Sequence, residues 1–346
     1  MSMTKAMGME AFNEALHEIT INRRDLLPND VELEILYCGI CHSDLHQVRN
    51  DWGHTNLPLV PGHEIVGRVT KVGKDVTTFK VGDLAGIGCI VDSCRTCPAC
   101  RSGLEQFCSS GVTFSFNSPD RVSGGFTFGG FSKRYVCDAR YVLHVPAFEN
   151  LSATAPLLCA GITVYSPLKR YEVAGKKIAI VGIGGLGHVA IRFAKAMGAH
   201  VTVITTSEAK VADAKRLGAD AAILSTDPAA MAAHRGEFAF ILDTVSAKHN
   251  IDALMALLSV RGSLVMVGLS PDPLEVGSFS VVGGEKSLSG SNIGGIPLTQ
   301  EMLDFAYEHN VLPDVEVIPV DYVNTAMERL AKGDVKYRFV VDMSTL

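Results

Sequence analysis

The sequence lacks the features by which membrane-spanning and nucleic-acid-binding proteins are usually detected. None of its apolar runs reaches the roughly 18 residues that a membrane span needs. It has no basic stripe interleaved with aromatic residues, and its formal net charge is −6. We therefore expect neither a membrane nor a nucleic acid as a partner.

Charge runs, low-complexity tracts and internal repeats are also missing. With 47% hydrophobic and 20% charged residues the chain reads as globular, and 346 residues exceed what one compact core usually holds. Two folding units are therefore expected. Residues 1–20 carry Glu10, Glu14 and Glu18 where a signal peptide would need an apolar core, which favours a cytoplasmic protein.

The nine cysteines do not suggest a disulfide framework in a reducing compartment, and their clustering indicates metal. Cys94, Cys97, Cys100 and Cys108 have the spacing C-x2-C-x2-C-x7-C, which predicts a closed tetrahedral zinc site. An iron–sulfur cluster or unligated thiols are the alternatives, because spacing alone does not exclude them. Four thiolates leave no open position, so zinc bound here would be structural.

The pattern of the chain changes near its middle. Residues 31–145 contain short β-like runs between Gly, Pro and Asp turns: Val31–Cys38, Ile65–Val72 and Tyr141–Val145. From residue 177 a strand, a tight turn, a helix and a second strand follow one another, which is a βαβ unit. These are Ile178–Gly182, Leu186–Met197 and Val201–Thr205.

Three more apolar runs, separated by stretches long enough for helices, extend this unit: Ala221–Leu224, Phe238–Asp243 and Ser263–Gly268. The alternation predicts a doubly wound parallel sheet. The chain is thus expected to be an α/β protein with one β-rich part and one Rossmann-type part.

A G-x-G-x-x-G motif stands at the first turn of the βαβ unit. Gly182 permits the tight turn, Gly184 lets a pyrophosphate approach the backbone, and Gly187 allows close packing of helix on strand. The motif alone would be a weak signal, but its place between a strand and a helix predicts dinucleotide binding.

The end of the second strand indicates which dinucleotide binds. An NAD site normally has an acidic residue there, whereas this chain has Thr205, Thr206 and Ser207, followed by Lys210. Hydroxyl groups and a lysine suit a ribose 2′-phosphate, so NADP(H) is predicted. The hydroxyl residues can also cap the helix that starts near Glu208, and that acid keeps NAD as an alternative.

Two segments, Cys38–His46 and Pro61–Glu64, combine cysteine, histidine and carboxylates with glycines. A catalytic zinc ion needs two or three soft or borderline ligands and an open position. Cys41, His63 and the later Cys159 can form such a set, although each histidine taken alone would more often be a packed or surface residue.

At this point the chain resembles, from end to end, the zinc-dependent medium-chain alcohol dehydrogenases, in particular the subgroup similar to cinnamyl alcohol dehydrogenase and its bacterial NADPH-dependent aldehyde reductases. The residues that carry the resemblance are Cys41–His46, Pro61–Gly67, Cys94–Cys108, Leu158–Leu168, Val181–His188 and Lys336–Asp342. It implies an oxidoreductase that transfers hydride between NADP(H) and aldehydes or primary alcohols.

The resemblance also implies the domain layout. Residues 1–152 and 289–346 would form a GroES-like catalytic domain with two zinc sites, and 153–288 a Rossmann domain that binds NADP(H). In the family the region Leu274–Ser291 supplies an edge-strand contact, which implies a homodimer; an internal loop over the sheet is the alternative.

For the active site, the resemblance implies that Cys41, His63 and Cys159 hold catalytic zinc and that Glu64 ligates transiently. Asp44 would orient His63, while Ser43 touches the substrate oxygen and His46 passes the proton to solvent. Zinc would polarise the aldehyde oxygen as NADPH delivers hydride. His42 would meet the pyrophosphate, and further cofactor contacts are implied at Thr163, Gly185, Leu186, Thr244, Val267, Ser291 and Asn292.

The substrate pocket is implied at Trp52, Cys89, Phe114, Phe116 and Ile293. Together with Phe126 and Phe128 these side chains would suit apolar or aromatic aldehydes, although the aromatics of Thr113–Phe128 could equally belong to the core. We expect broad aldehyde use over strict specialisation for cinnamaldehyde. Within enzymes, an NAD-linked alcohol or polyol dehydrogenase is the alternative. Outside them, a non-catalytic NADP-binding protein would be expected to lack the zinc ligands or the proton relay that this chain retains.

Overall fold

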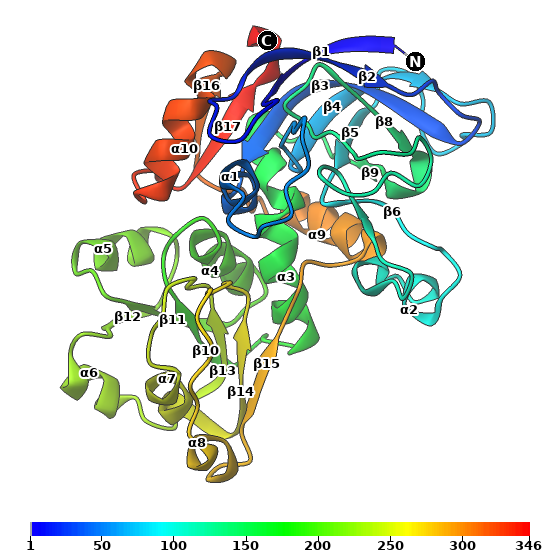
Figure 1. Cartoon of the computed structure of the whole chain (residues 1–346). Helices are drawn as coiled ribbons and strands as arrows, with labels where there is room; N and C mark the ends of the chain where they lie inside the picture. The colour runs from blue at the N-terminus through cyan, green and yellow to red at the C-terminus, as the bar shows by residue number, and fades with distance from the viewer. Residues whose placement is uncertain (1) are drawn as a thin grey trace. The chain divides into compact units, whose positions relative to one another are not determined.

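The computed structural model describes residues 2–346 and divides them into two units, each built around its own sheet (Figure 1). The first unit contains the described residues up to Cys159 together with Gly294–Tyr307 and Leu312–Leu346. The second contains Ala160–Ile293 and Glu308–Val311.

The largest sheet of the first unit has the order β16-β17-β3-β4-β5-β9, and β8 also pairs with β3. Its strands are β3 (Asp30–Ile40), β4 (Ile65–Val72), β5 (Leu84–Ile87), β8 (Arg134–Asp138), β9 (Leu143–His144), β16 (Val315–Pro319) and β17 (Arg338–Asp342). Near its start β3 is paired with β4 and β8, and near its end with β4 and β17. Strands from the two ends of the chain therefore share one sheet, as Figure 1 shows for blue β3 and red β17.

Two small antiparallel sheets complete the β structure of this unit: β1 (Ser2–Gly8) with β2 (His17–Arg23), and β6 (Ile90–Asp92) with β7 (Thr113–Phe114). Its helices have between three and 13 residues. They are α1 (His42–Arg49), α2 (Pro98–Arg101), η1 (Glu105–Phe107), η2 (Ala139–Tyr141), η3 (Leu151–Leu158), α9 (Ile296–Glu308), η4 (Val320–Tyr322), α10 (Val323–Ala331) and η5 (Met343–Thr345). Because α1 begins directly after β3, the position of the first turn of this helix is fixed by the end of that strand.

The second unit is a parallel sheet in the order β12-β11-β10-β13-β14-β15. The strands are β10 (Lys177–Val181), β11 (His200–Thr205), β12 (Ala221–Leu224), β13 (Phe238–Asp243), β14 (Leu258–Met266) and β15 (Ser287–Gly290). They alternate with α3 (Ala160–Arg170), α4 (Gly187–Ala196), α5 (Ala209–Arg216), α6 (Pro228–Ala233), α7 (Ile251–Leu257) and α8 (Ser278–Val282). Chain order reverses on either side of β10, as in a doubly wound fold.

The predicted α/β class, with one β-rich part and one doubly wound parallel sheet, is confirmed. The predicted bounds of two strands were wrong. Tyr141–Val145 is not one strand, because the Asp138 side chain accepts the backbone N–H of Arg140 and caps a 3-10 turn over Ala139–Tyr141. β14 begins at Leu258, earlier than the predicted Ser263, with a register shift between Phe238 and Phe240 of its neighbour.

No single helix in residues 2–346 is long and apolar enough to cross a membrane. Two consecutive helices, Leu151–Leu158 and Ala160–Arg170, reach that length and composition only when taken together, and most of their residues are buried.

Candidate functional site

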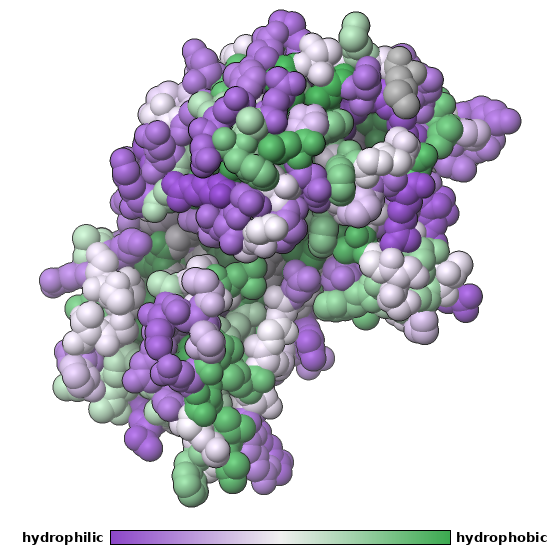
Figure 2. All heavy atoms as spheres, in the orientation of Figure 1, coloured by the Kyte–Doolittle hydropathy of each residue, from purple (hydrophilic) through white to green (hydrophobic). Residues whose placement is uncertain are grey.

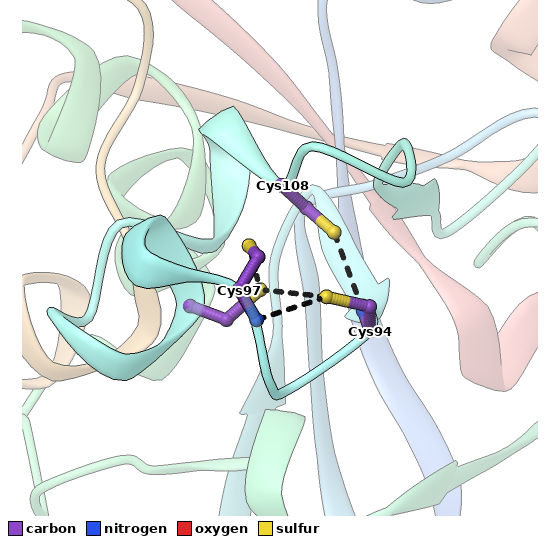
Figure 3. A group of neighbouring side chains, drawn as sticks. Cys94, Cys97 and Cys108 are labelled. Atoms are coloured by element: carbon purple, nitrogen blue, oxygen red, sulfur yellow. Dashed lines mark hydrogen bonds between the residues drawn. The ribbon is translucent and has the colours of Figure 1, made fainter.

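The four cysteines of the 94–108 lobe converge on one point. Their sulfur atoms lie within 4.8 Å of one another, with Cys94 Sγ 3.9 Å and Cys97 Sγ 3.5 Å from Cys100 Sγ. Zinc–sulfur bonds of about 2.3 Å in a tetrahedron require sulfur separations near 3.8 Å. Figure 3 shows Cys94, Cys97 and Cys108 pointing inward from separate stretches of the lobe, so the lobe fits a closed tetrathiolate site.

Backbone N–H groups of the lobe favour thiolates. The N–H of Cys97 lies 3.3 Å from Cys94 Sγ, and the N–H of Cys94 lies 3.3 Å from Cys108 Sγ. Hydrogen bonds from the backbone of Thr96 and Cys97 lower the pKa of the Cys94 thiol to about 5. A thiolate is the form that binds metal, so the local backbone prepares the site.

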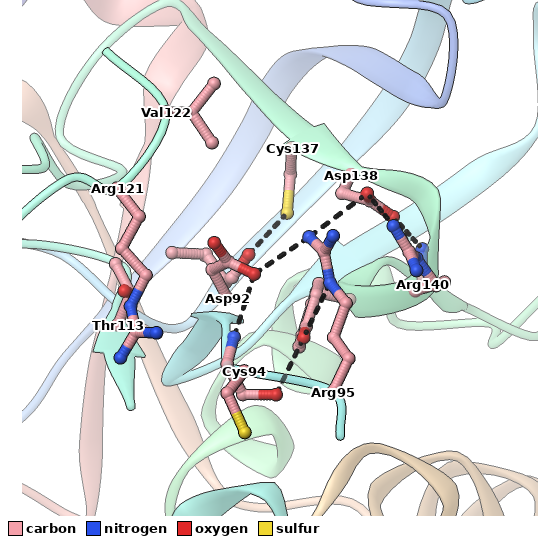
Figure 4. Close-up of polar contacts among 12 residues, drawn as sticks. Asp92, Cys94, Arg95, Thr113, Arg121, Val122, Cys137, Asp138 and Arg140 are labelled. Atoms are coloured by element: carbon pink, nitrogen blue, oxygen red, sulfur yellow. Dashed lines mark hydrogen bonds and ion pairs between the residues drawn. The ribbon is translucent and has the colours of Figure 1, made fainter. Parts of the chain in front are cut away.

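A chain of side chains ties this lobe to the main sheet. Cys100 Sγ lies 3.2 Å from Ser93 Oγ, which lies 2.8 Å from the Tyr141 hydroxyl. The Arg95 Nε group donates to that hydroxyl at 3.4 Å. In Figure 4 the Arg95 guanidinium lies between two carboxylates, with its Nη2 2.8 Å from Asp92 and 3.3 Å from Asp138.

A second cluster contains Cys41, His63, Glu64 and Cys159, whose ligand atoms also lie within 4.8 Å of one another. Cys41 precedes α1, His63 and Glu64 precede β4, and Cys159 follows η3. The two sulfur atoms are 4.0 Å apart, again the spacing of tetrahedral zinc. Two thiols, an imidazole and a carboxylate suit a zinc ion that keeps one position for substrate or water.

Asp44 holds the histidine of this cluster. Its Oδ1 lies 3.1 Å from His63 Nδ1 and accepts the Gly62 N–H at 2.9 Å, while Oδ2 accepts the Cys41 N–H at 2.9 Å. Asp44 is fully buried, so it fixes the start of α1 and the ring of His63 together. With Nδ1 engaged, Nε2 is the nitrogen available to a metal.

Glu64 faces Arg338, which comes from β17. The two form an ion pair in which both side chains are buried. Burial raises the pKa of Glu64 above its ordinary value, and the Arg338 guanidinium opposes that rise. Glu64 Oε2 has no hydrogen-bond partner within residues 2–346, as expected for an oxygen that can turn to a cation. A Cβ at Gly39 would overlap this carboxylate, so glycine leaves room for Glu64 in its present position.

Ser43 and His46 lie on one face of α1, one turn apart. Ser43 Oγ is 3.8 Å from Cys41 Sγ. The partly exposed His46 has Nδ1 2.7 Å from Asp51 Oδ2, and its ring is 5.2 Å from that of Trp52. Asp51 was not predicted as a site residue, although the Asn-Asp-Trp-Gly turn after α1 indicates a chain reversal toward the helix end.

The glycine motif opens α4 as predicted. Gly182 has φ of 91°, a value that favours glycine, and a Cβ at Gly187 would overlap the Gly182 carbonyl oxygen. Gly184 has open space where a Cβ would be. The buried ring of His188 lies with Nδ1 2.9 Å from the Gly184 carbonyl oxygen. The turn therefore presents bare backbone at a helix start, which suits a pyrophosphate.

The residues expected at the adenosine end lie together after β11. Thr205 Oγ1 accepts the Ser207 N–H at 3.2 Å, and the Lys210 ammonium donates to the Ile183 carbonyl at 3.2 Å. Lys210 therefore reaches from α5 to the glycine turn. Of the other expected cofactor residues, His42 is the first residue of α1 in the first unit. The rest belong to the second unit: Thr163 lies in α3, Gly185 and Leu186 immediately before α4, Thr244 after β13, Val267 after β14, and Ser291 and Asn292 after β15.

The expected substrate residues lie on several elements of the two units. Phe116 is buried and stacks on His63 with ring centroids 5.6 Å apart. The Cys89 thiol neighbours Cys159, whereas Phe114 is 41% exposed on β7. Trp52 adjoins His46, and Ile293 belongs to the second unit.

The expectation for Phe126 and Phe128 was wrong. Both line a separate cavity of about 390 Å³, together with Arg24, Arg95 and Cys137. The hairpin that bends back at Gly124 and Gly125, both with positive φ, carries them to that side.

Two family models match this chain. Residues 27–147 match the alcohol dehydrogenase GroES-like domain, and residues 185–308 match the zinc-binding dehydrogenase domain. The chain belongs to the zinc-binding alcohol dehydrogenases. The predicted family, a GroES-like plus Rossmann fold, alcohol–aldehyde oxidoreduction and a requirement for zinc are thereby confirmed.

Named relatives of this dehydrogenase cover nearly the whole chain. It is 54% identical to mannitol dehydrogenase of Petroselinum crispum, over 95% of this chain and 98% of the relative. It is 51% identical to the aldehyde reductase YahK of Escherichia coli, over 99% of both. It is 50% identical to NADP-dependent alcohol dehydrogenase C 1 of Mycolicibacterium smegmatis, over 100% and 99%.

Solved structures agree. A cinnamyl alcohol dehydrogenase from Sorghum bicolor superposes with a TM-score of 0.95 and 46% identity, covering 99% of this chain and 98% of that one. The protein named CAD from Helicobacter pylori, complexed with NADP(H), gives 0.92 and 38% with the same coverage. The predicted NADP(H) cofactor thus agrees with what two of these proteins are named for.

Proposed function

We propose that this alcohol dehydrogenase reduces aldehydes to primary alcohols, and oxidises the alcohols in reverse, with NADP(H) and two zinc ions per chain. The observation that carries the proposal is the cluster of Cys41, His63, Glu64 and Cys159. It combines two thiols and one imidazole with a carboxylate that can exchange on and off a metal ion. The tetrathiolate lobe would hold the second, structural zinc ion.

The ligands we assign to catalytic zinc are Cys41, His63 and Cys159, with Glu64 as an exchanging ligand. When bound, zinc supplies Lewis-acid polarisation of a carbonyl and the dinucleotide supplies hydride. The two thiolates neutralise the charge of the ion, and Asp44 holds His63 in the tautomer that leaves Nε2 for the metal.

The proton path we assign runs along α1. The Ser43 hydroxyl, beside Cys41, is placed to exchange a proton with the substrate oxygen. His46 exchanges protons with solvent, because its ring is partly exposed and Asp51 fixes the orientation of Nδ1. Asp51 is therefore added to the predicted relay as an orienting group.

For the cofactor we assign Gly182, Gly184 and Gly187 to the pyrophosphate and Thr205, Ser207 and Lys210 to a 2′-phosphate. The support is the positive φ of Gly182 and the hydrogen bond from the Lys210 ammonium to the Ile183 carbonyl in the glycine turn. We also assign catalysis to the first unit and cofactor binding to the second, whose boundaries at Cys159 and Ile293 lie a few residues beyond the expected boundaries at 152 and 288.

We propose that the enzyme is a homodimer joined through the second unit. The strand β15 is an edge of its sheet, and exposed apolar side chains lie around it: Phe279 is 89% exposed, Val260 75% and Val282 72%. Figure 2 shows green, apolar surface at the end of this unit where Figure 1 places α8. A solution mass near 37.0 kDa would contradict the dimer.

We propose a cytoplasmic location, since the nine cysteines are free thiols and eight of them lie in the two metal clusters or are buried, a set that needs a reducing compartment.

The test is the loss of absorbance at 340 nm with NADPH and then NADH against aliphatic and aromatic aldehydes, before and after zinc chelation. Turnover with NADPH that chelation removes is expected. No turnover with either cofactor would contradict the proposal. A second candidate, a polyol dehydrogenase, is favoured by the identity to a protein named mannitol dehydrogenase. Oxidation of mannitol faster than of primary monoalcohols would establish it.

A further inference from the structure

The lobe at residues 113–128 supplies an aromatic wall to the site through Phe116. This ring is 8% exposed and lies 15° from parallel with His63 at 5.6 Å between centroids. A carbonyl oxygen held at the metal cluster would place the substituent of the aldehyde next to this ring. Phe116 is therefore the aromatic side chain that packs directly on a ligand of the metal cluster.

Asn117, the next residue, anchors this wall. Its backbone is left-handed, with φ of 50°, a conformation that asparagine tolerates better than most residues. Its side-chain Oδ1 accepts the backbone N–H of Asn56 at 2.9 Å, which fixes the orientation of the amide. The Nδ2 group must then face the opposite way, where it donates to Gln47 Oε1 at 2.6 Å.

Gln47 belongs to α1, the helix that carries Ser43 and His46. Its side chain is buried, and Oε1 also accepts from the Thr55 hydroxyl at 2.9 Å. Neither Gln47 nor Asn117 belongs to a metal cluster or to the assigned proton path. Their hydrogen bond is thus a direct link between the catalytic helix and the segment that carries Phe116.

We propose that Asn117, through Gln47, is a positioning residue that fixes Phe116 over the substrate site and so determines selectivity for aldehydes with a flat aromatic or unsaturated substituent. The inference rests on the proposed aldehyde reductase function. A planar substituent gains most from a fixed ring face, whereas a short aliphatic aldehyde makes little contact with it.

The experiment compares Asn117→Gly with the wild-type holoenzyme, using benzaldehyde, cinnamaldehyde and propanal with NADPH. Glycine keeps the left-handed backbone and removes the side chain with its hydrogen bonds to Gln47, Asn56 and the His54 carbonyl. The KM for the two aromatic aldehydes should rise about tenfold, with propanal changed less than about twofold. The KM for NADPH and the zinc content should stay unchanged. Asn310→Gly is the matched control, since Asn310 is exposed and has φ of 51°.

Gln47→Leu tests the same inference independently if Asn117→Gly does not fold. It should cause the same selectivity change, and the double variant should add little to either, because both substitutions break the same hydrogen bond between Asn117 and Gln47. Equal losses for all three aldehydes, or unchanged selectivity, would overturn the inference. Absence of NADPH-dependent reduction by the wild-type enzyme would instead overturn the proposed function.

Discussion

Glu64 and Arg338 lie 274 positions apart in the chain and meet as a buried ion pair beside the candidate catalytic metal cluster. The guanidinium comes from β17 and the carboxylate from the turn before β4. A buried pair of this kind costs desolvation of both charges, and neither charge is stable there without the other. Arg338 is thus a condition for an ionised Glu64.

Replacing Arg338 tests that dependence. Arg338→Met should lower the free energy of unfolding by about 3–5 kcal/mol, because the buried Glu64 is then either charged without a cation or protonated without its hydrogen-bond partner. Urea denaturation measures the change. Arg261→Met is the control, since Arg261 and its partner Glu285 are mostly exposed and the loss there should be under about 1 kcal/mol. Equal effects of the two substitutions would contradict the argument.

The second prediction concerns zinc retention in the tetrathiolate lobe. A thiolate at Cys100 has no proton to give, so Ser93 must donate to it, Tyr141 to Ser93, and Arg95 to Tyr141. Ser93→Ala should weaken zinc binding in this lobe about 10–100-fold. The rate of zinc transfer to a colorimetric chelator measures it, with Ser110→Ala, at an exposed position of the same lobe, as control. Identical rates of zinc transfer in the two variants would show that Ser93 does not support metal binding.

The third prediction concerns the cofactor. Thr205→Asp places a carboxylate where we expect the 2′-phosphate, so repulsion should reduce kcat/KM with NADPH at least about tenfold, or 1.4 kcal/mol. The value with NADH should be equal or higher, since an acid there accepts from a 2′-hydroxyl. Steady-state kinetics with both cofactors are decisive. Unchanged discrimination would refute the assignment of the Thr205–Lys210 segment.

The fourth prediction is a pH dependence. Partial burial raises the pKa of Asp138, but hydrogen bonds from Arg140 outweigh it, so the pKa lies below its ordinary value near 3.8. A carboxyl with a lowered folded pKa stabilises above its unfolded pKa and loses this effect as the pH falls through the folded value.

Asp138→Asn should therefore destabilise by up to about 1 kcal/mol at pH 7, a modest value because Arg140 is exposed. The difference from wild type should stay constant down to about pH 5 and shrink only below the ordinary carboxyl pKa. Urea titrations of both proteins across this range measure it. A difference that vanishes already near pH 6 would assign the effect to another group.

Local patterns were enough for the sites that are contiguous in sequence. The spacing of Cys94–Cys108 and the turn at Gly182 depend on residues within a few positions of one another, so their geometry follows from the local backbone. Asp51 and Asn117 were missed for a different reason. Each side chain comes from a loop that reverses at a left-handed residue. For Asp51 that residue is the preceding Asn50, and for Asn117 it is the residue itself. No apolar periodicity marks such turns in the sequence.

Arg338 shows a further limit. The resemblance included the segment Lys336–Asp342, but no pattern in the sequence joins it to Glu64, because sheet pairing between strands so distant in the chain is decided by tertiary packing. The same holds for Phe126 and Phe128. The direction of their hairpin depends on two glycines with positive φ, and the apolar character of the two rings does not by itself predict which cavity they line.

The pairing of β17 with β3 bears on how the protein is made. Until residues 338–342 leave the ribosome, the segment Tyr37–Ile40 that leads into α1 has an open edge on that side. Glu64 also has no ion-pair partner until Arg338 has been synthesised. Synthesis is N-terminal first, so the catalytic half of the enzyme can mature only after the intervening cofactor unit has been translated. A chain cut short by its last ten residues should therefore expose an unpaired strand and aggregate, even though all its zinc-binding residues are present.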